Sequence, residues 1–177
     1  MFWLSDKIEF PPYEFTSKEG IIALGGDLSS ERLIYAYKNG IFPWFSEGEP
    51  IVWYCPHDRM VLFPDDLKVS KSMRKIINKK EFVITENTAF NKVIYNCKNI
   101  DRNDGFGTWI TYDMQQAYIN LHQKGIAKSI EVWFDNELVG GLYGIDLGHI
   151  FCGESMFSLE SNASKVAFIE LAQSGDY

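Results

Sequence analysis

The sequence has few of the residues that build disulfide frameworks or metal sites. It contains three cysteines, an odd number with no Cys-x-x-Cys pair: Cys55, Cys97 and Cys152. This pattern argues against a disulfide framework and favours a reducing compartment, so we expect a cytoplasmic protein. The three histidines are scattered without neighbouring carboxylates at ligand spacing, and we therefore expect no metal site.

Long apolar runs and an excess of positive charge are absent too. No stretch reaches the length of a membrane span, and the aromatic N-terminus is interrupted by Ser5, Asp6 and Lys7, unlike a signal peptide. The net charge of −7 excludes a protein that coats nucleic acid through bulk positive charge, but it does not exclude a local basic patch. With 177 residues and no internal repeat, the chain has room for one core and a small appendage.

Aromatic residues, in contrast, are abundant. They make up 15% of the chain, which is enough to fill a core and also to line a pocket that stacks on a base or an aromatic ligand. In the segment 41–45, Pro43 fixes the backbone beside Trp44. We interpret this segment as a rigid wall.

Capping residues and apolar periodicity predict five helices. They are expected between Ser29 and Gly40 and over residues 68–80, 88–97, 113–124 and 163–173. We expect Ser161 or Asn162 to cap the last of them.

Four strands are predicted as well, over residues 81–85, 129–134, 137–145 and 149–157. Asp135-Asn136 is a two-residue hairpin signal, so these strands favour a mainly antiparallel meander and an α+β fold class. A loose boundary near residues 56–66 predicts a small N-terminal domain over 1–62 and a larger domain over 63–177.

One segment concentrates positive charge. Residues 68–80 contain no acid and six basic residues: Lys68, Lys71, Arg74, Lys75, Lys79 and Lys80. Apolar residues recur there at helical spacing, so one face of the helix should pack while the basic face meets water or a polyanion. A solvated surface and a phosphate contact are both compatible with this pattern.

The stretch around Ser155 resembles the nucleophile turn of a serine hydrolase only superficially. Such a turn needs glycine two residues after the serine, because the strained backbone leaves no room for a side chain, and Phe157 occupies that position. No Asp and His partners are arranged for a triad. We therefore interpret Ser155 as a structural turn residue.

Glu154 is a better candidate for chemistry. It lies between Gly153 and Ser155 at the end of an apolar strand, so its carboxylate should meet a cation, either from an internal Lys or Arg or from a ligand. Trp44, Trp109 and Tyr118 lie in aromatic segments bordered by Gly or Pro, and they are suited to line a pocket for a large apolar group beside this acid.

Seven short blocks together resemble the leucyl/phenylalanyl-tRNA-protein transferases, from about Gly20 to the end of the chain. Their order and spacing are far more specific than any single block. They are Gly25-Gly-Asp-Leu-Ser29, Ala36-Tyr-Lys-Asn-Gly-Ile-Phe-Pro-Trp-Phe45, Thr108-Trp-Ile110, Ser129-Ile-Glu-Val-Trp133, Leu138-Val-Gly-Gly-Leu-Tyr-Gly144, Gly153-Glu-Ser-Met-Phe-Ser158 and Ala163-Ser-Lys165.

The resemblance implies a fold and an activity. Members of this family take Leu or Phe, and sometimes Met, from an aminoacyl-tRNA and attach it to the N-terminal Arg or Lys of an acceptor protein, which marks that protein for degradation. They use no metal or dissociable cofactor. Their larger C-terminal domain has an acetyltransferase-like (GNAT) fold and follows a small N-terminal domain.

The resemblance also implies roles for individual residues. Glu154 matches an acidic residue at the active centre and is the implied catalytic residue, holding an ammonium or the basic acceptor side chain. Tyr37 would lie near the adenosine. The basic segment 68–80 would bind the tRNA acceptor stem through phosphates. The hydrophobic pocket and its approach would be shaped by Trp44, Trp109, Tyr118, Leu142 and Phe151.

The chain departs from the family pattern at its end. The family's proposed catalytic Asp and Gln lie in an Asp-x-Gln strand after the helix that begins Ala163-Ser-Lys165, whereas this sequence stops at Gly175-Asp-Tyr177. Asp176 falls in the connecting turn and does not match that Asp. We therefore expect little or no transferase activity from this 177-residue chain.

Two other functions remain open. One is a module without catalysis that binds aminoacyl-tRNA or a basic N-terminus. The other is an acyl-CoA N-acetyltransferase, but Gln123-Lys-Gly-Ile-Ala127 is one residue short of the pyrophosphate-binding turn and follows a helix instead of preceding one.

Overall fold

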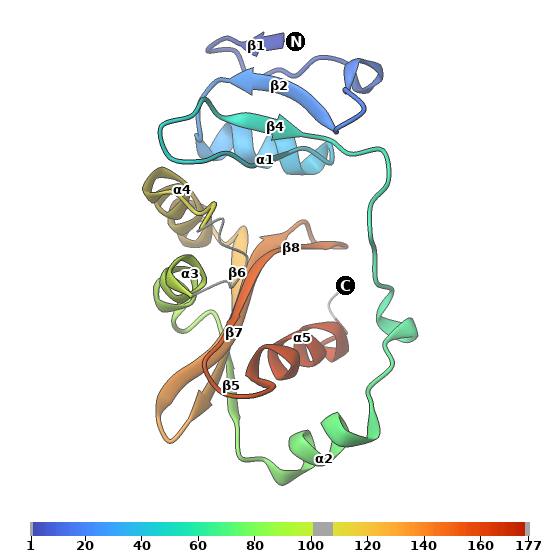
Figure 1. Cartoon of the computed structure of the whole chain (residues 1–177), viewed down its shortest axis with the longest axis vertical. Coiled ribbons are helices and arrows are strands. Elements are labelled where there is room, and N and C mark those ends of the chain that lie inside the picture. The colour runs from blue at the N-terminus through green and yellow to red at the C-terminus, as the bar shows by residue number, and fades with distance from the viewer. Residues whose placement is uncertain (1, 101–107, 176–177) are drawn as a thin grey trace.

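Two four-stranded sheets organise the chain (Figure 1). The structure is a computed structural model and describes residues 2–100 and 108–175. The N-terminal sheet has the order β1-β2-β4-β3, with a parallel pair between β1 and β2 and antiparallel pairs elsewhere. Its strands are β1 (Phe2–Leu4), β2 (Ile21–Gly25), β3 (Phe42–Pro43) and β4 (Val52–Tyr54).

The second sheet is an antiparallel meander in the order β5-β6-β7-β8. Asp135 and Asn136 join β6 to β7 with φ values of 49° and 65°, the backbone that a two-residue type I′ hairpin requires. The predicted hairpin is therefore confirmed, as is the α+β class. The strands are β5 (Val83–Glu86), β6 (Ala127–Phe134), β7 (Glu137–Asp146) and β8 (Phe151–Ser158).

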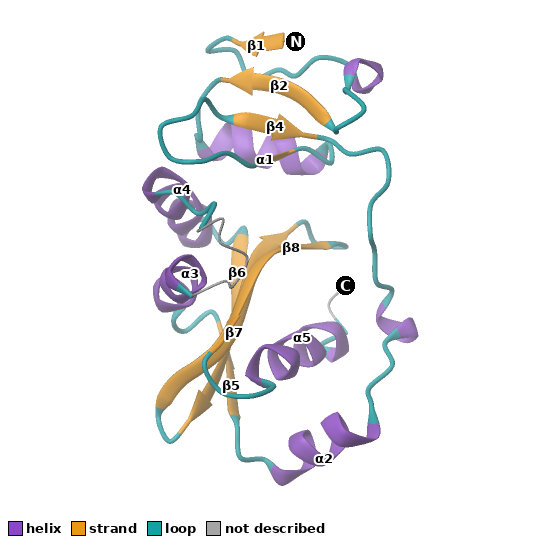
Figure 2. Ribbon diagram, in the orientation of Figure 1, coloured by secondary structure: helices purple, strands orange, loops and turns teal. Residues whose placement is uncertain are grey.

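Helices cover both faces of the second sheet (Figure 2). α3 and α4 pack on one face and α5 on the other, while α1 lies between the N-terminal sheet and α4 (Figure 1). The α-helices are α1 (Ser30–Lys38), α2 (Lys71–Lys79), α3 (Phe90–Asn99), α4 (Tyr112–Gln123) and α5 (Ala163–Gln173). Short 3-10 turns occur at η1 (Tyr13–Phe15) and η2 (Pro64–Asp66). None of the helices formed by the described residues combines the length and the apolar character needed to cross a membrane.

Side-chain N-caps mark the starts of α1, α2 and α4, whereas α3 and α5 begin without one. α4 begins where Thr111 accepts a hydrogen bond from the Met114 amide, as expected for an N-cap. Asn162 occupies the N-cap of α5, but its φ of 70° is left-handed and its side chain makes no capping hydrogen bond. Instead, the amide of Ser164 donates to Ser158 Oγ over 3.2 Å. The prediction gave the N-cap position correctly at Asn162, but the capping hydrogen bond comes from Ser158, the last residue of β8, and not from the Asn162 side chain.

The alternation of side chains along β7 divides the apolar residues into two clusters. Tyr143 and Ile145 face α3 and α4, in a cluster that continues into Trp53 and Leu33 of the N-terminal sheet and α1. Leu142 instead faces α5 in a separate cluster. The two sheets thus share one apolar core on the α3 and α4 side. The predicted domain boundary near residue 62 stays a prediction.

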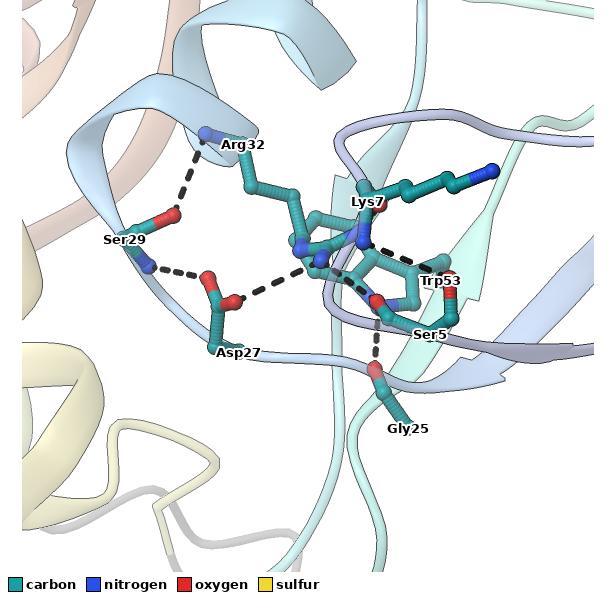
Figure 3. A network of polar contacts seen from close by, with 7 residues as sticks. All are labelled: Ser5, Lys7, Gly25, Asp27, Ser29, Arg32 and Trp53. Atoms are coloured by element: carbon teal, nitrogen blue, oxygen red, sulfur yellow. Dashed lines mark hydrogen bonds and ion pairs between the residues drawn. The ribbon is translucent and has the colours of Figure 1, made fainter.

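Arg32 ties the N-terminal segment to α1 (Figure 3). Its side chain is fully buried, and its guanidinium donates to the carbonyls of Ser5 (2.8 Å) and Lys7 (3.1 Å) and contacts Asp27 at 3.4 Å. Partial burial raises the pKa of Asp27, but hydrogen bonds from Ser29 and the contact with Arg32 lower the pKa more, so that its net pKa is below the ordinary value. One buried cation therefore fixes residues 5–7 against α1.

We predict that Arg32→Ala lowers the free energy of unfolding by roughly 2–4 kcal/mol, because it removes a fully buried guanidinium together with its hydrogen bonds to two carbonyl groups. Lys38→Ala, on the exposed end of the same helix, should change it by less than about 0.5 kcal/mol. Urea unfolding followed by tryptophan fluorescence measures both. Equal effects of the two substitutions would contradict a stabilising role for the Arg32 network.

Candidate active site

Three side chains from three different elements meet where the two sheets share their core. Tyr37 of α1 donates a hydrogen bond to Glu154 Oε1 over 2.6 Å, and Tyr118 of α4 donates to Glu154 Oε2 over 3.2 Å. The two tyrosine hydroxyls also hydrogen-bond to each other. We call this group the Tyr-Tyr-Glu cluster. It joins the N-terminal part of the chain to the second sheet through polar atoms.

A β-bulge aims Glu154 at the tyrosines. In the pairing of β7 with β8, Tyr143 lies opposite Ser155 and Gly144 lies opposite Gly153, which leaves Glu154 as the extra residue. A Cβ atom on Gly144 would stand 2.3 Å from the carbonyl oxygen of Cys152, so only glycine fits beside this bulge. The irregular pairing thus directs the carboxyl group toward α1 and α4.

Ring packing holds the two tyrosines in place. Tyr37 and Tyr118 meet edge to face with centroids 6.4 Å apart, and Tyr118 packs in the same manner on Tyr143 at 5.7 Å. All three rings are buried. The hydroxyl groups are therefore fixed by helix and sheet packing and not by flexible loops.

Burial controls the protonation of the cluster. Burial raises the pKa of Glu154 to about 7, although the Tyr37 and Tyr118 hydrogen bonds and the charge of Arg59 act to lower that pKa. Burial, together with the Glu154 charge, also raises the pKa values of Tyr37 and Tyr118 well above their ordinary value. In the described part of the chain no Lys or Arg forms an ion pair with Glu154. The site therefore contains an acid that can be neutral or charged near neutral pH.

Another carboxylate, that of Glu131, receives its hydrogen bonds from side chains within the fold. Glu131 of β6 is fully buried, and its two oxygens accept hydrogen bonds from the hydroxyls of Ser129 (2.5 Å), Thr85 (2.6 Å) and Thr88 (2.8 Å). The indole of Trp133 in turn donates to the Thr85 hydroxyl. Because these donors all come from within the fold, Glu131 has a structural role, which accounts for the block Ser129–Trp133.

The other predicted pocket residues are divided between the two faces of the sheet. Trp44 is 52% exposed and lies beside Tyr54, and Trp109 is partly buried against the same cluster as Tyr37 and Tyr118. Leu142 and Phe151 lie in the other apolar cluster, on the α5 face. The structure thus brings Tyr37, Tyr118 and Glu154 together, and it does not bring Leu142 and Phe151 to them.

Two cavities lie away from this cluster. One of about 310 Å³ is lined by Lys128, Asp146 and Phe151 among others, at the start of β6 and the end of β7, next to α5. The other, of about 490 Å³, lies between α3 and the β6-β7 hairpin and includes Tyr95 and Trp133. Neither is lined by the Tyr-Tyr-Glu cluster. Across residues 2–100 and 108–175, no three His, Cys, Asp or Glu side chains are grouped to hold a metal ion.

The basic segment forms α2 as predicted, over a slightly shorter range. Met73 is buried against the α5 cluster, and Ile76 and Ile77 pack beside it. The basic side chains are all exposed, and Lys79 alone among them forms an ion pair within the described residues, with Glu81 at 3.7 Å. The exposed set comprises Lys68, Lys71, Arg74, Lys75, Lys79 and Lys80. One apolar face therefore anchors a helix that presents positive charge to solvent.

Comparison with protein families identifies the chain. Residues 61–176 match the leucyl/phenylalanyl-tRNA protein transferase family, and residues 26–57 match the N-terminal domain of the same family. The chain belongs to the leucyl/phenylalanyl-tRNA-protein transferase family. The resemblance found in the sequence is thereby confirmed.

Individual relatives agree. The chain is 62% identical over 172 residues to the leucyl/phenylalanyl-tRNA--protein transferase of Flavobacterium johnsoniae, covering 97% of this chain and 81% of the relative. It is 55% identical to that of Flavobacterium psychrophilum, covering 97% and 82%, and 51% identical to that of Christiangramia forsetii, covering 98% and 82%.

Sequence reasoning missed one charged neighbour of the cluster. Arg59 donates to the carbonyl of Gly40 over 3.1 Å and lies 5.0 Å from the ring centroid of Phe42, and its charge lowers the pKa of Glu154. A lone Arg in a connecting segment carries no pattern that could reveal this position. Asp176, which we had placed in a connecting turn, lies outside the described residues.

The raised pKa of Glu154 predicts a pH-dependent cost of folding. The folded pKa of about 7 exceeds the ordinary 4.5, so the native state holds an extra proton between these values and loses stability as pH rises through about 7. Glu154→Gln removes the buried charge. The change that this substitution makes to the free energy of unfolding should therefore be more favourable at pH 8 than at pH 5, by up to about 3 kcal/mol.

Urea unfolding at both pH values measures this difference. The control is Glu160→Gln, on an exposed turn, which should give the same change at pH 5 and pH 8. If Glu154→Gln also has the same effect at both pH values, then Glu154 does not titrate between them.

Proposed function

We propose that the protein transfers Leu or Phe, and also Met, from aminoacyl-tRNA to the N-terminal Arg or Lys of acceptor proteins, creating a degradation signal. The observation that carries this proposal is the partly buried carboxyl of Glu154, held by Tyr37 and Tyr118 at the junction of the two sheets, in a chain of this transferase family. The partners are aminoacyl-tRNA and acceptor proteins. No cofactor is required, and we expect the reaction to take place in the cytoplasm.

The chemistry is aminolysis of an ester that is already activated. The attacking α-amine must be neutral, and the oxyanion that develops must be stabilised, so positioning can supply much of the rate. A carboxyl group with a pKa of about 7 can accept a proton at neutral pH and return it, which is the property of an effective general base. We assign this catalytic role to Glu154.

The aromatic residues near the cluster supply the donor site in this proposal. Trp109 packs against the apolar cluster that contains Tyr37 and Tyr118, and Trp44 exposes its ring beside Tyr54; a pocket built from such rings selects Leu and Phe by size and apolarity. One methylene of difference is worth about 1–3 kcal/mol, so partial tolerance of Met follows. Leu142 and Phe151 pack against α5, and we assign them to the support of the sheet.

We also propose that the second sheet and its helices form an acetyltransferase-like domain. An antiparallel meander with α3 and α4 on one face and α5 on the other supports this fold. The chain spans 81–82% of the length of the relatives described above. Our expectation that a polypeptide of these 177 residues has little activity stays a prediction.

A transfer assay tests the proposed activity. Labelled Phe should move from Phe-tRNA onto a protein that begins with Arg and not onto the same protein beginning with Ser. Glu154→Ala should lower kcat/KM by roughly 10²–10⁴-fold, the usual contribution of general base catalysis, while Glu160→Ala should leave it unchanged. The assay is run on the natural gene product, with its intact mass measured, and on the 177-residue polypeptide. Absence of amino-acid transfer by the natural gene product would contradict the proposed function.

Salt dependence tests the role of α2. If its basic face contacts phosphates, replacing Lys71, Arg74 and Lys75 by Ala should reduce the slope of log K for tRNA binding against log salt by about 2–3. The matched control replaces three exposed lysines elsewhere, Lys18, Lys38 and Lys124, and should leave the slope unchanged. Equal slopes for the two triple variants would show that α2 makes no phosphate contact.

A further inference from the structure

The Tyr-Tyr-Glu cluster has three hydrogen-bonding contacts among its three groups. Tyr37 contacts Glu154 at 2.6 Å, Tyr118 contacts Glu154 at 3.2 Å, and the two hydroxyls contact each other. Each tyrosine brings one proton, since burial keeps both phenols protonated. The number of protons in the cluster is therefore two when Glu154 is charged and three when it is neutral.

Only the neutral cluster supplies a proton to every contact. When Glu154 is charged, both tyrosines donate to it. With three protons, the Tyr118 bond is reversed: Glu154 donates to Tyr118, Tyr118 donates to Tyr37, and Tyr37 donates to Glu154, so each group donates once and accepts once. With two protons, one of the three oxygen pairs has no proton between its members. Chains of hydrogen bonds in a low-dielectric interior strengthen one another, and this favours the closed ring.

We propose that Tyr118 is a positioning residue that closes a three-proton ring with Tyr37 and neutral Glu154, and that the ring opens when Glu154 gives up its proton. This differs from the pocket wall that the family resemblance implies for Tyr118, whose side chain is fully buried and whose hydroxyl points to the carboxyl group.

The charged and titratable groups around the cluster change the pKa values of its members, but they leave Glu154 as the member that titrates. Arg59, from the segment after β4, favours the charged form of Glu154. On β8 itself, burial raises the pKa of the Cys152 thiol, with a further increase from the Glu154 charge, and burial also raises the pKa of the Cys55 thiol after β4. On β7, Tyr143 acts on Tyr118 and further disfavours its ionisation. Both tyrosines of the ring thus stay neutral while Glu154 titrates.

The catalytic role of the ring rests on the proposed function. With the ring open, the Glu154 carboxylate takes a proton from the attacking α-amine as the new C–N bond forms. The ester C–O bond then breaks, its electron pair stays on the tRNA oxygen, and that oxygen takes the proton from Glu154. The products are the amide and the tRNA hydroxyl, and Glu154 is again charged. Tyr118 and Tyr37 stabilise the intermediate in which Glu154 holds the proton.

The titration of Glu154 in Tyr118→Phe tests the ring. The Cδ signal of Glu154 is followed by NMR in protein labelled with [13C]glutamate and is assigned by its absence in Glu154→Gln. If Tyr118 closes the ring, Tyr118→Phe removes two hydrogen bonds from the cluster in which Glu154 is neutral. From the cluster in which Glu154 is charged, it removes only the 3.2 Å hydrogen bond between Tyr118 and Glu154. The titration midpoint should therefore fall, by about half a pH unit or more. If Tyr118 is only an independent donor to the anion, the midpoint should rise, and this result would overturn the proposal.

Controls separate the ring from other effects. Tyr95→Phe, an exposed tyrosine on α3, should leave the midpoint unchanged. If Tyr118→Phe does not fold, hydrogen exchange of the tyrosine hydroxyl protons provides the test. Slow exchange is expected at pH 5.5 and fast exchange at pH 8.5 in the unsubstituted protein, whereas Glu154→Gln should give slow exchange at both. Fast exchange at pH 5.5 in the unsubstituted protein would exclude a closed ring.

These measurements use the protein without tRNA, so they are independent of transfer. A lowered midpoint together with no transfer would leave the ring intact and refute the proposed function. Transfer together with a raised midpoint would refute the ring alone.

Discussion

The structure depends on one partly buried carboxyl group, that of Glu154, which has no ion-pair partner among the described residues. The hydroxyls of Tyr37 and Tyr118 hold Glu154 by hydrogen bonds, and Arg59 acts on it through its charge. A buried acid without a paired cation shifts toward its neutral form, because desolvation penalises the charge. Since that shift brings the pKa to about 7, the same packing that assembles the two sheets also sets the chemistry of the site.

This constraint explains several unrelated parts of the chain. α1 must present Tyr37, and Arg32 fixes the same helix against the N-terminal segment. Gly144 permits the bulge that turns Glu154 out of the regular pairing of β8. Tyr37 and Gly144 lie in two of the blocks by which the family is recognised, and Arg32 lies between two of them. Their common physical role is to hold three oxygen atoms together in an apolar surrounding.

Local signals in the sequence were sufficient for the second sheet and its helices. The hairpin at Asp135-Asn136 and the start of α1 after Ser29 followed from turn and capping preferences, because these depend on adjacent residues. The N-terminal strands were not predicted, since β3 has two residues and contains Pro43. Glu154 was identified from its neighbours along the chain. Its contact with Tyr37, 117 residues away in sequence, depends on how the two sheets pack and has no local pattern. The resemblance to a family grouped Leu142 with the pocket, whereas strand alternation places it on the α5 face.

The central claim is that the charge state of Glu154 controls transfer. It is tested most directly by the pH dependence of single-turnover phenylalanyl transfer, expressed as the ratio of the rate of the unsubstituted protein to that of Glu154→Gln. This ratio cancels the titration of the acceptor amine, which is common to both proteins. The account predicts that the ratio rises with pH through a midpoint near 7. A ratio that stays constant from pH 5.5 to 8.5 would contradict it.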